Sequence, residues 1–413
     1  MRALLERMIE ARPVIKDSAA ALVSGLVQAL KEESAPSRIE LHLERFSRQL
    51  RALWLRSVAA ETSWVLRSPT ECEVSWLSAE HDGFGYERDL QPGELEERCS
   101  HFFDAVPAPW KAEHIIFSSG QAALLAILLS FKSVRPLRVQ HLGGYFETRQ
   151  LVQSCPSLCN LVAKDADIVI AEPVACDGSF DYHGKLEIAA AVAGANALIL
   201  DTTLLGRADR IGDLLGGLDR NLLVLRCTSG LKLLQAGLEL ANVGIVSVHS
   251  RSGVALGKLA AALREIRTLG GFGLRYADVL ALEAPFVFDP DYADRYAGRV
   301  FAHNAALASA VAERNQLFVP PFGANPSPYC VFSLRNCEEG AYDRLAAKIA
   351  AGAAERQILF NRGGSFGFRG HRYEIVRPEK QPPFLRVAMG RRSGWSFRGV
   401  LALMADIAAR TSI

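Results

Sequence analysis

Short apolar runs alternate with helix-length segments between about residue 110 and residue 285. Each run holds four to six residues and is rich in Val, Ile and Leu. Runs of this kind are typical of strands that are buried on both faces of a sheet, and intervening helices join such strands in parallel. The alternation therefore predicts an α/β fold with a largely parallel sheet. The expected strands are His114–Phe117, Asp167–Ala171, Ala197–Leu200, Asn221–Leu225 and Val243–Val248.

Two parts of different pattern flank this central part. The first contains two helix-like stretches, Met1–Leu30 and Ile39–Leu55, joined by a Ser- and Pro-containing link. The last part mixes helices with two strand-like pieces, which suggests a smaller α+β domain. Its expected elements are Tyr292–Arg314, Tyr329–Leu334, Gly340–Arg356, Pro383–Met389 and a helix from Ser396. We therefore predict a helical N-terminal extension (1–83), a large α/β domain (84–285) and a small C-terminal domain (286–413).

Composition excludes several classes of protein. The 413 residues are 49% hydrophobic and 22% charged, so the chain is neither disordered nor fibrous. A net charge of +2 argues against general polyanion binding, no apolar run is long enough to span a membrane, and the N-terminus is unlike a signal peptide. Eight scattered cysteines predict neither disulfides nor a metal site. We expect a cytoplasmic protein without nucleic-acid or membrane partners.

The ends of the expected strands are where an α/β sheet binds ligands. Ser118, Ser119 and Gly120 follow the first strand and precede an alanine-rich helix. Their hydroxyl and backbone N–H groups suit a phosphate, although an ordinary helix N-cap explains the same residues. Asp201 ends another strand, where an aspartate is either a cap or turn residue or a functional carboxylate.

Two further features point to cofactor chemistry. The chain has only ten lysines among 47 basic residues, and one of them, Lys232, lies among leucines just after a strand. Its stem either snorkels to solvent or places a desolvated amine where Schiff-base chemistry would use it. Tyr145 and Phe146 form an aromatic pair that suits either core packing or a cofactor platform. A phosphate cradle, an aromatic ring, an aspartate and a lysine, in this order, are the parts that bind pyridoxal phosphate.

The chain resembles fold-type I pyridoxal-phosphate enzymes of the Cys/Met-metabolism (trans-sulfuration) family, which includes cystathionine γ-synthase, cystathionine γ-lyase and methionine γ-lyase. The resemblance covers roughly residues 84–395. It implies a mostly parallel sheet flanked by helices, a smaller α+β C-terminal domain, and the cofactor pyridoxal 5'-phosphate. It also implies a homodimer or homotetramer with shared active sites, because Tyr86 and Arg88 match a family motif that reaches the cofactor phosphate of a neighbouring subunit.

The remaining motifs match the family residue by residue. Ser119-Gly120-Gln121 resembles its phosphate loop, and Ser229-Gly230-Leu231-Lys232 resembles the segment with the phosphate-binding serine and the Schiff-base lysine. Tyr145 matches the tyrosine that stacks on the cofactor ring, and Asp201 matches the aspartate that pairs with the pyridine nitrogen. Near the C-terminus, Arg386 matches the arginine that grips the substrate carboxylate, and Ser365 lies in a loop similar to the one that assists it.

Departures from the family pattern matter for the reaction. Gln121 replaces a methionine, and Cys176 stands where the family has an asparagine near the phenolic oxygen of the cofactor. Glu147 occupies a position where methionine γ-lyases carry a cysteine. The interval from Asp201 to Lys232 is longer than usual, and the N-terminal extension has no counterpart in short family members. We therefore expect a retained cofactor site and a substrate of its own.

The resemblance implies a reaction as well. Lys232 is expected to hold the cofactor and to move the α-proton of a small amino-acid substrate, with Tyr145 and Glu147 transferring a proton to the leaving group. The implied activity is γ-elimination or γ-replacement by a transferase or lyase, on a homoserine ester, a cysteine- or methionine-like substrate, or one like S-adenosylmethionine. Three alternatives remain: a cyclase of a γ-activated amino acid, an aminotransferase or decarboxylase, and a non-catalytic binding subunit.

Overall fold

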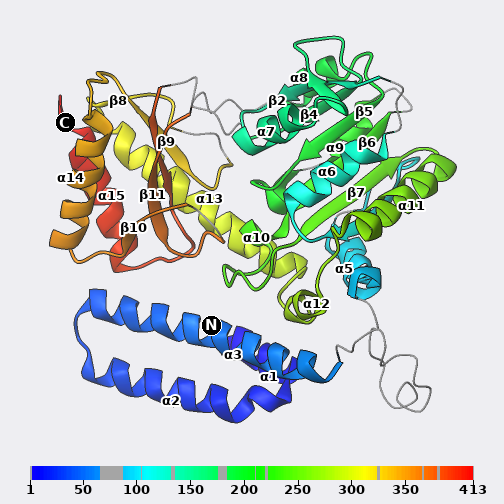
Figure 1. Cartoon of the computed structure of the whole chain (residues 1–413). Coiled ribbons are helices and arrows are strands. Elements are labelled where there is room, and N and C mark those ends of the chain that lie inside the picture. Colours follow the sequence, from blue (N-terminus) through cyan, green and yellow to red (C-terminus); the bar gives the residue numbers. More distant parts are fainter. Residues whose placement is uncertain are drawn as a thin grey trace.

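Three bodies make up the molecule, as Figure 1 shows in a computed structural model: a pair of long helices, a large sheet with its helices, and a smaller sheet with its own. None of the helices in the described part of the chain is long and apolar enough to cross a membrane. The structure describes residues 2–65, 87–103, 105–131, 135–174, 184–209, 211–218, 222–322, 326–364, 367–378 and 382–412.

The large sheet has seven strands in the order β1-β7-β6-β5-β4-β2-β3. β7 runs antiparallel to both of its neighbours, and the pairs from β6 to β3 are parallel, which confirms the predicted α/β class. A short helix, α10 (Gly230–Leu233), follows β6 directly. The strands are β1 (Lys111–Phe117), β2 (Leu137–Leu142), β3 (Cys159–Leu161), β4 (Ile168–Ala171), β5 (Ala197–Asp201), β6 (Leu223–Ser229) and β7 (Gly244–Ser250).

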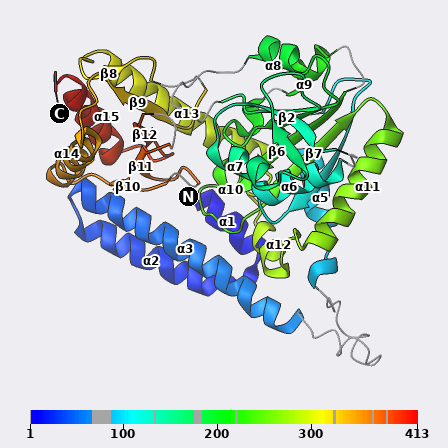
Figure 2. The ribbon, with the colours of Figure 1, turned by 45° about the horizontal axis from the view of Figure 1, so that its top comes forward.

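Alternate residues of the central strands face two separate cores. On one face, Ile170 and Ile199 pack with helices α6, α7 and α11, and on the other Val169 and Leu198 pack with α8 and α9. Figure 2 shows α8 and α9 close together and apart from α11. This period of two is what buries each strand on both sides. The flanking helices and turns are η3 (Glu87–Asp89), α5 (Gly93–Phe102), α6 (Gly120–Ser130), α7 (Phe146–Ser154), α8 (Lys185–Ala191), η4 (Gly206–Asp209), α9 (Ile211–Gly216), α11 (Gly253–Gly270) and α12 (Tyr276–Leu282).

The five expected strands all form, and β2 and β3 are additional. β2 was missed because Arg138, Gln140 and His141 interrupt its apolar pattern, and β3 is only three residues long. β6 also runs four residues further than expected, through Arg226 and Thr228 to Ser229. Arg226 and Thr228 are buried although they are polar, so hydropathy alone ends this strand too early.

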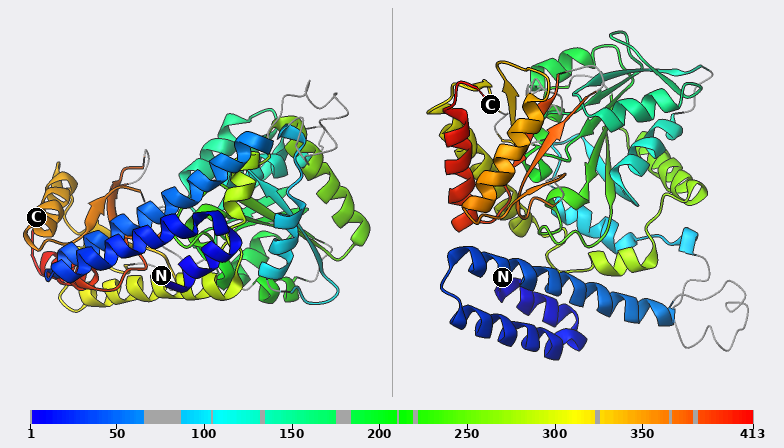
Figure 3. Two further views of the ribbon diagram at one scale, coloured as in Figure 1. Left: turned by 90° about the horizontal axis from the view of Figure 1, so that it is seen from below. Right: turned by 60° about the vertical axis from the view of Figure 1, so that its left-hand side comes forward.

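The smaller sheet has the order β10-β11-β12-β9-β8 and packs on helices near the C-terminus, as Figure 3 shows. Its expected helices and two of its strands form close to their predicted bounds, whereas β8, β10 and β11 were not predicted. The boundaries 1–83, 84–285 and 286–413 stay a prediction. The elements are α13 (Pro290–Ala312), β8 (Phe318–Val319), β9 (Cys330–Leu334), α14 (Ala341–Glu355), β10 (Phe360–Arg362), β11 (His371–Val376), β12 (Phe384–Ala388) and α15 (Trp395–Ala408).

The N-terminal helices lie along one side of both sheets. One continuous helix was expected over Met1–Leu30, but the chain breaks at Pro13, whose ring cannot continue a helix. Trp54 is fully buried and donates a hydrogen bond of 3.0 Å from Nε1 to the carbonyl of Ala281, so the extension shares a core with the large domain. The elements are α1 (Arg2–Ala11), η1 (Pro13–Ile15), α2 (Lys16–Glu32) and α3 (Pro36–Val65).

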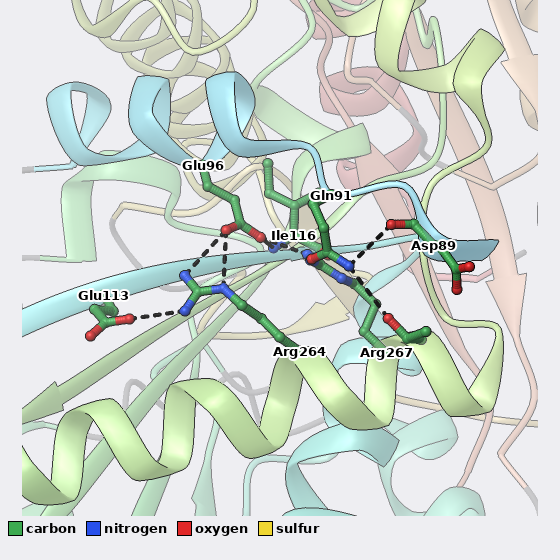
Figure 4. A network of polar contacts seen from close by, with 8 residues as sticks. Asp89, Gln91, Glu96, Glu113, Ile116, Arg264 and Arg267 are labelled. Carbon is green, nitrogen blue, oxygen red and sulfur yellow. Dashed lines mark hydrogen bonds and ion pairs between the residues drawn. The ribbon is translucent and has the colours of Figure 1, made fainter. Parts of the chain in front are cut away.

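A partly buried ion-pair network ties α5 and α11 to the edge strand β1 (Figure 4). Arg267 of α11 pairs with Glu96 of α5 at 2.6 Å and donates to the carbonyl of Ile116 in β1 at 2.9 Å. Arg264, one turn earlier, bridges Glu96 and Glu113. Because the guanidinium of Arg267 is only 1% exposed, its charge depends on these partners.

Candidate functional site

One cavity of about 550 Å³ opens at the carboxyl ends of the large-sheet strands, and the small sheet closes its other side. Residues that follow β1, β4, β5 and β6 line it, together with side chains of β11 and β12. Nine residues singled out from the sequence meet there: Ser119, Gly120, Gln121, Tyr145, Glu147, Asp201, Ser229, Lys232 and Arg386.

The two turns that carry the serines of the predicted phosphate cradle, Ser119 and Ser229, pack closely against each other. Ser119 caps α6, with its Oγ accepting the N–H of Ala122 at 3.0 Å, so the ordinary N-cap interpretation holds for this hydroxyl. A Cβ at Gly120 would lie 3.2 Å from the Cβ of Ser229, which is why a glycine stands at this crossing. The N–H of Ser229 donates to Oγ1 of Thr203 at 2.9 Å. The turns after β1, β5 and β6 are thereby brought into one cradle.

Asp201 lies at the end of β5, where its side chain meets the cavity. One oxygen accepts the N–H of Thr203 at 2.9 Å. Burial, reinforced by the nearby carboxylate of Glu172, raises the pKa of Asp201 to about 6. A carboxylate in this state is stabilised by any cation that enters the cavity beside it.

Glu172, at the end of β4, positions the loop that carries Tyr145. Its Oε2 accepts the N–H groups of Gly144 and Tyr145, each at 2.9 Å, and its Oε1 bonds Nε2 of His141 at 2.8 Å. Burial acts to raise the pKa of Glu172, but the His141 bond and the two N–H groups outweigh it and hold the pKa below its usual value. Gly143 has φ +142°, and a Cβ there would overlap the glutamate.

Tyr145 and Glu147 stand at the start of α7. Tyr145 occupies the N-cap position, and its ring meets that of Phe146 edge-on with centroids 5.4 Å apart. Phe146 is 57% exposed, so the pair is not ordinary core packing. Glu147 lies in the first turn and lines the same cavity.

Lys232 sits in α10, the single helical turn between β6 and the following loop. Leu233 and Leu234 beside it are buried, whereas Lys232 itself is partly exposed and lines the cavity. The leucines therefore anchor the turn, and the amine is left on the cavity side. This placement supports the functional interpretation over simple snorkelling at the outer surface.

The guanidinium of Arg386 has an internal partner that the sequence did not reveal. Arg386 in β12 faces Glu374 in β11, and Nη2 lies 2.6 Å from Oε2. Both side chains line the cavity, and the ring of Tyr329 lies 5.7 Å from the guanidinium carbon. A residue expected to grip a substrate carboxylate is thus already paired with a carboxylate of the chain.

Of the four remaining predicted site residues, the structure describes only Arg88. Arg88 lies in η3, is exposed and does not line this cavity, so its role stays a prediction. Tyr86, Cys176 and Ser365 fall outside the described residues. Glu172 and Glu374 were missed as site residues. The sequence could have indicated Glu172, because it directly follows an apolar strand. Nothing in the sequence pattern indicates Glu374, since only strand pairing brings it to Arg386.

No family model and no curated protein matches this chain. Among solved structures, a cystathionine γ-synthase from Xanthomonas oryzae pv. oryzae in complex with cystathionine is 17% identical, with a TM-score of 0.59 over 80% of this chain and 91% of that one. A methionine γ-lyase from Micromonospora echinospora is 17% identical, with a TM-score of 0.58 over 79% and 88%. Yeast cystathionine γ-lyase is 15% identical, with a TM-score of 0.58 over 79% and 89%. The chain therefore shares the fold of these proteins, which the sequence motifs also resemble.

Proposed function

We propose that the protein is a pyridoxal-phosphate-dependent enzyme that acts at the α and γ positions of an amino acid. The observation that carries the proposal is the meeting of Lys232, Asp201, Tyr145 and the Ser119–Ser229 cradle in one cavity. These groups come from four separate strand-to-helix junctions of the large sheet. Structural packing alone does not require an amine, an acid, an aromatic ring and a small-residue cradle to converge on one open space.

The residues of the cavity fit this cofactor. Asp201, with its raised pKa, suits a cationic ring nitrogen, and the closely packed turns at Gly120 and Ser229 bring the N-terminus of α6 to the cavity, where it suits a phosphate. Tyr145 supplies an aromatic face, and Lys232 the amine that holds the cofactor covalently. When bound, pyridoxal phosphate supplies an electron sink that stabilises negative charge at the α-carbon of an amino acid.

Different side chains of the protein have separate roles in binding the substrate and in transferring its protons. Lys232 would take the α-proton of the bound amino acid, and Arg386 would orient the substrate carboxylate in place of its present partner Glu374. Tyr145 and Glu147, at the start of α7, are placed to pass a proton to a leaving group. The structural neighbours include a cystathionine γ-synthase and a methionine γ-lyase, which supports γ-replacement or γ-elimination as the reaction class.

The first test is the Lys232→Ala variant of the full chain, reconstituted with pyridoxal phosphate. We expect it to lose the visible absorption band of the lysine-bound cofactor, since no other lysine lines the cavity among the residues that the structure describes. Lys258→Ala, an exposed lysine of α11, is the matched control and should keep the band. A band that survives in Lys232→Ala would remove the basis of the proposal.

The second experiment identifies the reaction. Holo-protein is incubated with O-acylhomoserines, cystathionine, methionine, cysteine and S-adenosylmethionine, and the products are followed by mass spectrometry. A keto acid that has lost its γ-substituent, formed with release of ammonia, indicates γ-elimination, and a new γ-bond indicates γ-replacement. A cyclic product, an amino transfer or carbon dioxide release would instead assign the chain to one of the other classes on this fold.

A further inference from the structure

A second cavity of about 240 Å³ lies between the N-terminal helices and the C-terminal body. Its walls come from α1, α3 and α13, the loop that follows α10, and the segments around Arg369 and Arg391. None of its lining residues lines the first cavity. The linings of the two cavities come next to each other in the described sequence at Phe368, which lines the first cavity, and Arg369, which lines the second.

Four arginines line this small space: Arg299, Arg369, Arg391 and Arg392. Among the ion pairs of the described residues, those of Arg369 and Arg392 both go to Glu44, and none involves Arg299 or Arg391. Glu44 is shared further, because it also pairs with Arg48 at 3.0 Å. Glu44 is therefore the ion-pair partner of three arginines, and two further arginines, Arg299 and Arg391, line the same cavity.

Arg391 is held in place by tyrosine side chains, and Arg369 and Arg392 rely on the shared carboxylate of Glu44. Arg391 donates to the hydroxyl of Tyr292 at 3.0 Å, and its guanidinium carbon lies 5.5 Å and 5.4 Å from the ring centroids of Tyr292 and Tyr296. The buried Nε of Arg369 makes no hydrogen bond among the described residues, and its ion-pair partner Glu44 lies 3.5 Å away. Burial lowers the pKa of both Arg369 and Arg392, as expected for guanidinium groups without enough counter-charge.

We propose that this cavity binds a small ligand with a phosphate or diphosphate group. Guanidinium groups recognise phosphate oxygens through paired N–H donors, and several of them converging on one space suit a multiply charged oxyanion. The volume is less than half that of the first cavity, which favours a compact ligand. Because α3, α13 and the segments around Arg369 and Arg391 meet here, the bound anion fastens the helical extension to the body of the enzyme.

Calorimetric titration of inorganic diphosphate into the full chain tests the proposal. Saturating pyridoxal phosphate is present, so that phosphate sites of the first cavity are filled. We expect one diphosphate per chain and a higher thermal midpoint, since a ligand that binds only the folded state stabilises it. The absence of binding at millimolar diphosphate would overturn the proposal.

Variants locate the binding. Arg299→Glu should raise the Kd at least tenfold, and Arg299 is an exposed helix residue whose replacement leaves the core intact. Arg295→Glu, one turn earlier on the same helix and outside the cavity, is the control and should leave the Kd within about threefold. Arg391→Gln should also weaken binding at least tenfold. Equal affinity in wild type, Arg299→Glu and Arg391→Gln would exclude this cavity as the site.

This result is independent of the proposed catalytic function. Arg299 and Arg391 do not line the first cavity, so their variants should keep the visible band of the cofactor. Loss of diphosphate binding with the band intact supports the second site. Loss of both in Arg299→Glu would mean that the arginines act on the catalytic cavity and not on a separate anion.

Discussion

At the scale of single residues, the pairing of Arg386 with Glu374 bears directly on the proposed binding of a substrate carboxylate. The two groups lie 2.6 Å apart on neighbouring strands, and about a quarter of Arg386 is exposed to the cavity. A substrate carboxylate must compete with Glu374 for the same guanidinium. A substrate carboxylate therefore has to bind Arg386 more favourably than Glu374 does. The pair also keeps the arginine oriented when no substrate is bound.

Glu374→Gln should lower the KM for the amino-acid substrate several-fold, because the amide competes less strongly than a carboxylate for Arg386. Arg386→Ala should raise the KM at least tenfold through the loss of a charge-assisted contact. Steady-state kinetics of both variants measures the effect, with Glu355→Gln, an exposed change on α14, as the control. A higher KM in Glu374→Gln would mean that the glutamate itself contacts the substrate.

Asp201 connects function with stability. Its pKa is about 6 in the folded chain against 3.8 for a free side chain, so its favourable contribution is present below about pH 4 and is lost as the pH rises through 6. Near pH 7.5 the ionised group costs the cofactor-free fold about 1–3 kcal/mol. Asp201→Asn should remove this cost and, at the same time, weaken cofactor retention.

Urea unfolding of the cofactor-free protein tests the predicted direction of this pH-dependent change in unfolding free energy. The gain in unfolding free energy of Asp201→Asn should be clear near pH 7.5 and should shrink as the pH approaches 4. Asp213→Asn, an exposed change on α9, should show little gain at either pH. A gain that does not change with pH would show that packing, and not the charge, is responsible.

At the scale of elements, the network of Glu96, Arg264 and Arg267 fixes how α5 and α11 sit on β1 (Figure 4). Arg267→Leu should lower the free energy of unfolding by about 3–5 kcal/mol, because Glu96 and the carbonyl of Ile116 lose a buried cation. Chemical denaturation measures this loss. Arg275→Gln, which removes an exposed pair with Asp278, should cost less than about 1 kcal/mol.

At the scale of the whole molecule, the position of Arg88 bears on assembly. It is exposed and lies outside the catalytic cavity of its own chain. We propose a homodimer or homotetramer in which Arg88 reaches the cofactor phosphate of a neighbouring subunit. Light scattering should give at least a dimer, and a fully active monomer would contradict the proposal.

Subunit mixing tests the shared site directly. Arg88→Ala should weaken cofactor binding, and Lys232→Ala should bind none covalently. Mixed dimers regain one intact site, with Lys232 from one chain and Arg88 from the other, so that about a quarter of all sites should recover tight binding. Absorbance at limiting cofactor measures the recovery. No recovery on mixing would place Arg88 outside any shared site.

Much of the fold and of the catalytic cavity could be predicted because strong local patterns carried them. The apolar runs marked β1, β4, β5, β6 and β7, Asp201 directly follows one such run, and Lys232 lies shortly after the end of β6. Prediction failed where packing overrides local pattern. β2 is a strand despite its polar residues, because it pairs with β3 and β4 in the interior of the sheet. The helix expected over Met1–Leu30 ends early because Pro13 breaks it.

The amino-acid sequence by itself determined where the central strands lie and which polar groups stand at their ends, since short-range hydrophobic periodicity and chain order are local properties. Only the tertiary structure decided that Glu374 faces Arg386, that Glu172 holds the loop of Tyr145, and that four arginines share one small cavity. Those partners are far apart along the chain. Strand register and helix packing bring them together, and both depend on the free energy of the whole fold and not on any one segment.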